Sequence, residues 1–82
     1  MEERELREYA EAVTAYDIAI ANDEQDVVSY VYRGESEILM GSIEASLRDF
    51  EEVLRIGEEG GNPQLEPWVK RSKLLLGIHK RS

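Results

Sequence analysis

Two segments of this 82-residue chain lie 34 residues apart and carry the same pattern of side chains. Residues 12–20 and residues 46–54 each begin with a small residue and have an aromatic ring four positions later. A small or β-branched apolar residue and then an aliphatic one complete both segments. A fixed period of this length is typical of proteins built from stacked helix-turn-helix units. Because stacked units present grooved surfaces to other proteins, the period predicts a binding or assembly module.

The composition favours helix and argues against several other classes of protein. The chain holds six glycines and two prolines, and its commonest residues include strong helix formers. It has no cysteine, so neither a disulfide framework nor a thiolate metal site is expected, and the cytoplasm is the expected location. No apolar run is long enough to cross a membrane, and the acidic residues 1–5 do not resemble a signal peptide. The length predicts one domain.

The charge is distributed unevenly along the chain. The formal net charge is −8, and every one of the 18 acidic residues lies within residues 1–66. Residues 67–82 contain five basic residues and no acidic one, an arrangement that suits the C-terminal end of a helix dipole. The acidic body should repel nucleic acid and attract basic or apolar partners. We therefore expect neither a nucleic acid nor a membrane as the partner.

Apolar residues at three- and four-residue spacing predict an all-α fold. The expected elements are a helix over residues 3–22, a helical hairpin over residues 26–57, a loop over residues 58–65 and a last helix over residues 66–80. Asp23 or Asp26 can cap the hairpin's first helix, and Gly41 suits the left-handed backbone between its two helices. Gly57 is predicted to end the second helix. The short connection after Met40 requires the two helices to lie antiparallel.

Residues 27–60 resemble one tetratricopeptide repeat. The matching residues are Tyr30, Gly34 and Gly41 around the first helix and Ser46, Phe50, Val53 and Leu54 in the second. Three further residues, Ala12, Tyr16 and Ala19, match the second helix of a preceding unit, and Trp68 matches Tyr30 with a spacing of 38. The sequence departs from the family pattern at Glu37, where a tyrosine is common, at Ser46, where alanine is, and at Glu58, where proline is.

This resemblance implies a short right-handed superhelix of antiparallel helices, in which Gly34 and Ser46 lie at the closest approach of the paired helices. Tyr30 and Phe50 would then fill the wider gaps beside them. A closed four-helix bundle is the alternative architecture, and in such a bundle the first and last helices would touch.

The resemblance also implies a function, because tetratricopeptide repeats bind extended peptides or partner helices along the wall formed by the first helix of each unit. The matching positions here are Val28, Val31, Glu35, Ile38, Leu39, Glu66, Val69, Lys73 and Leu76. Glu35 would favour a basic group on the ligand and repel a carboxylate. The alternative for Val31 and Ile38 is that they pack only against neighbouring helices.

The leading hypothesis is therefore a non-catalytic scaffold or adaptor that binds another protein or peptide. The alternative is a structural module that forms a homo-oligomer through its exposed terminal helices. The sequence predicts no catalytic residue, cofactor or metal site. His79 is the only histidine, it lies three residues from the end of the chain, and the sequence implies no shaped pocket for it to serve as a general base. The acidic residues do not form the dense loop that calcium sites require.

Overall fold

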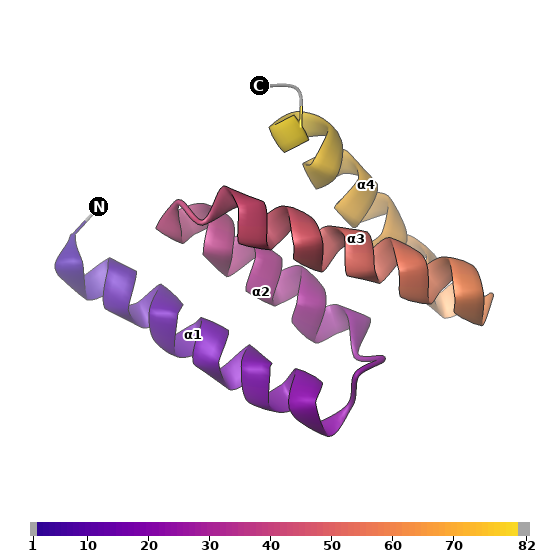
Figure 1. The fold of residues 1–82 in the computed structure, drawn as a ribbon, viewed down its shortest axis with the longest axis horizontal. Coiled ribbons are helices and arrows are strands. Elements are labelled where there is room, and N and C mark those ends of the chain that lie inside the picture. The colour runs from indigo at the N-terminus through magenta and orange to yellow at the C-terminus, as the bar shows by residue number, and fades with distance from the viewer. Residues whose placement is uncertain (1, 81–82) are drawn as a thin grey trace.

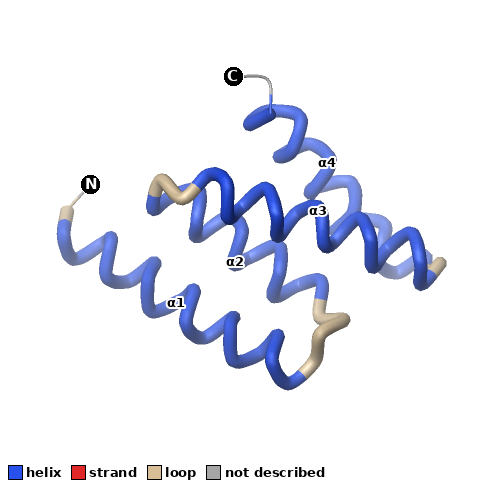
Figure 2. Tube along the Cα trace, viewed as in Figure 1, coloured by secondary structure: helices blue, strands red, loops and turns tan. Residues whose placement is uncertain are grey.

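The computed structural model describes residues 2–80, and over this range it confirms the predicted all-α fold. The helices are α1 (Glu3–Asn22), α2 (Val27–Met40), α3 (Ile43–Gly60) and α4 (Glu66–Lys80), with a short 3-10 helix, η1 (Pro63–Leu65), before the last. Figure 2 shows that short connections join them and that the described residues contain no strand.

Each helix packs antiparallel to the next one along the chain, as Figure 1 shows. The packed pairs are α1 with α2, α2 with α3 and α3 with α4, and α4 also reaches α2. Within residues 2–80, α1 and α4 do not form a packed pair, and they lie at opposite sides of the molecule in Figure 1. The arrangement is therefore an open succession of helical hairpins, and a closed four-helix bundle is excluded.

The α2–α3 pair forms the centre of the molecule. Phe50, Val53 and Ser46 of α3 are fully buried, as is Val31 of α2. A Cβ atom built on Gly34 would lie 2.7 Å from Cε1 of Phe50, so only glycine allows the ring to approach α2 this closely. Gly34 and Ser46 are both buried in this crossing, and Tyr30 packs against the same core, as the sequence predicts.

Local signals set the ends of α2. The Asp26 side chain accepts hydrogen bonds from the backbone N–H of Ser29 (3.2 Å) and from its hydroxyl (2.7 Å), and so caps the first turn. Gly41 has φ of +87°, a left-handed conformation that an L side chain rarely adopts, and its N–H donates to Ile38. Of the two predicted cap residues, Asp26 is therefore the one that caps α2, and Gly41 has the predicted left-handed conformation.

The end of α3 differs from the prediction. Gly57 does not stop the helix, which continues to Gly60 and is capped by Gly61 with φ of +58°. Gly57 instead allows α4 to approach, because a Cβ there would lie 2.5 Å from Cγ2 of Val69. The predicted loop over residues 58–65 is accordingly shorter: α3 takes its first residues and η1 takes its last three.

Candidate functional site

One side of α2 remains open to solvent although three helices pack against it. Val28, Tyr32, Glu35 and Leu39 recur at helical spacing and so share one stripe along α2. Tyr32 is 37% exposed and Leu39 is 49% exposed, whereas Val31 and Gly34, on the side that packs in the core, are buried. The stripe contacts α1 on one side and α4 on the other. We call the stripe, together with Tyr16 and Trp68, the open face of α2.

Three aromatic rings from three helices form a row across this face. The ring of Tyr32 lies between that of Tyr16 on α1, with centroids 6.0 Å apart, and that of Trp68 on α4, at 5.7 Å. The second contact is edge-to-face, with an interplanar angle of 82°. Tyr16 and Trp68 are half-buried, so each presents part of its surface to solvent. The row gives the face a rigid apolar centre.

Glu35 lies beside the row and is paired within the chain. Its carboxylate contacts the guanidinium of Arg71, which reaches across from α4. The expectation that Glu35 attracts a basic group from a ligand is therefore weakened, because an internal cation already neutralises the carboxylate. The pair ties α2 to α4 and holds the Trp68 side of the open face in place.

The remaining predicted groove residues differ in how deeply they are buried. Val31 and Leu76 belong to the core, with 0% and 6% of their surface exposed, so the expectation that they contact a ligand is wrong. Val28, Ile38 and Val69 are half-buried and pack against that core. Leu39, Lys73 and Glu66 are exposed. The groove positions deduced from the resemblance thus mix packing residues with accessible ones.

The residues predicted to carry the repeat pattern pack as structural residues. Tyr30, Leu54 and Trp68 lie against the core, and Ala12, Tyr16 and Ala19 are half-buried on α1. Tyr32 was not predicted as a ligand contact, although its place on the stripe with Val28, Glu35 and Leu39 was a signal available in the sequence.

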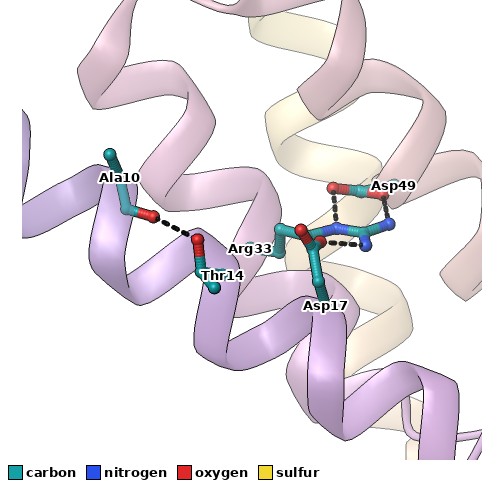
Figure 3. Close-up of polar contacts among 5 residues, drawn as sticks. All are labelled: Ala10, Thr14, Asp17, Arg33 and Asp49. Carbon is teal, nitrogen blue, oxygen red and sulfur yellow. Dashed lines mark hydrogen bonds and ion pairs between the residues drawn. The ribbon is translucent and has the colours of Figure 1, made fainter.

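A second polar feature, the ionic cluster of Asp17, Arg33, Asp49 and Glu37, joins the first three helices. Arg33 of α2 donates to both carboxylate oxygens of Asp49 on α3, at 2.9 and 2.5 Å, and to Asp17 on α1 at 2.8 Å. Figure 3 shows the guanidinium held between the two carboxylates. The nearby Thr14 hydroxyl donates instead to the carbonyl of Ala10 in its own helix. The bidentate bond to the buried Asp49 raises the pKa of Arg33, so this cation stays charged.

Glu37 adds a third carboxyl group to this cluster. Burial, together with the hydrogen bond and the negative charge of Asp49, raises the pKa of Glu37 to about 8. Its Oε1 atom is buried and has no hydrogen-bond partner among the described residues. Glu37 therefore carries a proton at neutral pH. Because it is then uncharged, Glu37 can lie close to the carboxylate of Asp49 beside the guanidinium of Arg33.

Glu37→Gln should stabilise the fold in a pH-dependent way. In the unfolded chain Glu37 ionises near pH 4.5, whereas in the folded protein it holds its proton to about pH 8. The folded state binds more protons in this window, so the stability of the natural chain falls as pH rises through it. Glutamine cannot ionise, and the gain should grow from near zero at pH 4.5 to roughly 1–2 kcal/mol above pH 8, after allowance for solvent screening.

Urea unfolding at several pH values between 4 and 9 measures this difference. Glu44→Gln makes the same substitution at an exposed position of α3 and serves as the control. A difference between the Glu37→Gln variant and the natural chain that stays constant across the range would contradict the assignment of the proton.

Residues 2–80 were also compared with the features of a ligand pocket, a metal site and a membrane span. A shallow hollow of about 270 Å³ lies on α4, lined by Lys73, Leu74, Gly77 and Ile78. Among residues 2–80, no group of three or more acidic or histidine side chains converges to hold a metal ion. None of the described helices is both long and apolar enough to span a membrane. His79 is half-buried near the end of α4.

Comparison with known proteins adds no assignment to this geometry. No protein-family model matches the chain, and no solved structure matches it significantly.

Proposed function

We propose that this protein is a non-catalytic interaction module and that the open face of α2 binds a peptide or a helix of another protein. The aromatic row of Tyr16, Tyr32 and Trp68 carries the proposal. Aromatic side chains offer large contact areas at a low cost in conformational entropy and are enriched among the residues that dominate binding energy. The row is partly exposed, shares the open face of α2 with the exposed Leu39, and is supported on three helices.

The resemblance to tetratricopeptide repeats supports the same face. In that family the first helix of each unit lines the binding wall, and α2 and α4 hold the corresponding positions here. A scaffold or adaptor in the cytoplasm is the role that follows, in agreement with the absence of cysteine.

The open face of α2 suits a ligand that has apolar side chains and also carries a cationic group. Tyr16, Tyr32, Trp68 and Leu39 offer apolar surface, and aromatic rings attract a guanidinium or ammonium group placed over them. The net charge of −8 adds a long-range attraction for basic ligands. Acidic ligands are disfavoured by the same charge.

Binding of peptides selected from a random displayed library tests this proposal. Trp68 is the only tryptophan, so its fluorescence reports directly on the open face of α2 during a titration. Tyr32→Ala removes the central ring of the row and should weaken the selected peptides roughly 10-fold or more, as the loss of a central aromatic contact does in other interfaces.

Arg48→Ala provides the matched control, because Arg48 is exposed on α3, which contributes no residue to the open face of α2. This variant should bind the selected peptides as the natural chain does. Equal affinity of the Tyr32→Ala variant and the natural chain, with circular dichroism showing both folded, would contradict the proposed face.

A further inference from the structure

The outer faces of the two terminal helices are both uncovered and both partly apolar. On α1, Ala15 and Ile18 lie on the side away from α2, and Ile18 is 60% exposed. No residue of α1 is buried, so α2 covers only one side of this helix. On α4, Leu74 is 64% exposed and Ile78 is 56% exposed, and they line the hollow over Gly77. Each terminal helix thus exposes an aliphatic strip.

The charges that flank the two strips have opposite signs. Glu8 and Glu11 precede Ala15 and Ile18 at helical spacing on the outer face of α1, and both are exposed. Lys70 and Lys73 hold the matching places beside Leu74 on α4, and they too are exposed. Over their full lengths, α1 carries five carboxylates and two arginines, whereas α4 carries four lysines or arginines and one carboxylate. The two outer faces are complementary in charge as well as in polarity.

The internal repeat of the chain indicates which terminal helix would pair with which. The segment on α1 matches that on α3 at a spacing of 34, and the start of α4 matches that of α2 at a spacing of 38. Since α2 and α3 pack together within one chain, an α2-like helix and an α3-like helix are suited to pair. The outer face of α4 and the outer face of α1 are the free members of such a pair.

We propose that copies of this chain associate head to tail, with the outer face of α4 of one copy packed against the outer face of α1 of the next. Leu74 and Ile78 would meet Ile18, and Lys73 would lie near Glu11. This contact joins two different surfaces, so it does not close on itself in a dimer and allows further copies to add. Pairing of α1 with α1, or of α4 with α4, would place charges of the same sign next to one another, and these charges would repel.

Two variants, each with one blocked end, test this association in sedimentation velocity experiments over a range of protein concentrations. Ile18→Glu and Leu74→Glu each place an anion within the apolar strip of one outer face, and two blocked ends repel one another because they carry the same charge. The average mass of the natural chain should rise with concentration beyond twice the monomer mass of 9.4 kDa. Each variant alone should remain a monomer. An equimolar mixture should form a 1:1 dimer and nothing larger, because the two variants retain one matching pair of ends.

Leu39→Glu is the matched control, since it replaces an exposed leucine on the open face of α2 and leaves both ends intact. Its association should equal that of the natural chain, which separates this proposal from the peptide-binding role of that face. The proposal is overturned if the natural chain stays monomeric at the highest concentration. It is equally overturned if either blocked variant associates alone, or if the mixture of the two stays monomeric while circular dichroism shows both folded.

Discussion

Phe50→Ala should lower the free energy of unfolding by about 3–5 kcal/mol, the usual cost of emptying a buried aromatic site. Phe50 is fully buried, and its ring fills the space that Gly34 leaves at the α2–α3 crossing. A domain of this length has a total stability of roughly 4–12 kcal/mol, so the loss is about a quarter of the total or more, and at the low end of that range it brings the variant to its unfolding midpoint. Urea unfolding followed by circular dichroism measures the loss.

A double-mutant cycle with Gly34→Ala tests the crossing itself. Alone, the added methyl group would lie 2.7 Å from Cε1 of Phe50, and Gly34→Ala should cost about 1–3 kcal/mol through overpacking. In a Phe50→Leu background the clash is relieved, so the same change should cost less. Additive effects of the two substitutions would contradict the close approach of ring and glycine.

Arg33→Met should destabilise the fold by about 3–5 kcal/mol at neutral pH, because it leaves the buried carboxylate of Asp49 without its cation. The substitution also removes the bond to Asp17 and the contact of the guanidinium with the Tyr30 ring, 5.4 Å from its centroid. Urea unfolding at pH 7 measures the loss.

Arg55→Met is the control for this prediction. Arg55 also pairs with two carboxylates, those of Glu52 and Glu59, but it does so on the exposed surface of α3. Exposed ion pairs contribute little to stability, so this variant should unfold almost as the natural chain does. Similar losses for the two arginine variants would show that the ionic cluster gains nothing from its burial.

The helices and the central crossing were predictable because they depend on local patterns. The cap at Asp26 and the left-handed Gly41 each leave a signal within a few residues, and the 34-residue period can be read directly by comparing two short segments. Gly57 was misassigned because a glycine that ends a helix and a glycine that admits a neighbouring chain look alike in a sequence. Only the position of Val69, twelve residues away on α4, distinguishes the two roles.

The site was less predictable because it depends on how the helices are registered against one another. The helical spacing places Tyr32 on a stripe of α2, but it does not show that Tyr16 and Trp68 lie on either side of it. The ionic cluster depends on the same register, since Arg33 meets carboxylates 16 residues before and after it. The burial of Val31 and Leu76 also follows from neighbours that belong to other helices.

The most direct test of the interaction surface is an NMR titration of the ¹⁵N-labelled chain with a peptide selected from the displayed library. Trp68 provides a single indole N–H signal at the edge of the aromatic row. We expect this signal and the amides of Tyr16, Tyr32 and Leu39 to shift together and saturate at one equivalent of peptide. An unchanged indole signal at saturation, with the shifts gathered around Arg48 and Arg55 on α3, would contradict the assignment of the open face of α2 as the binding site.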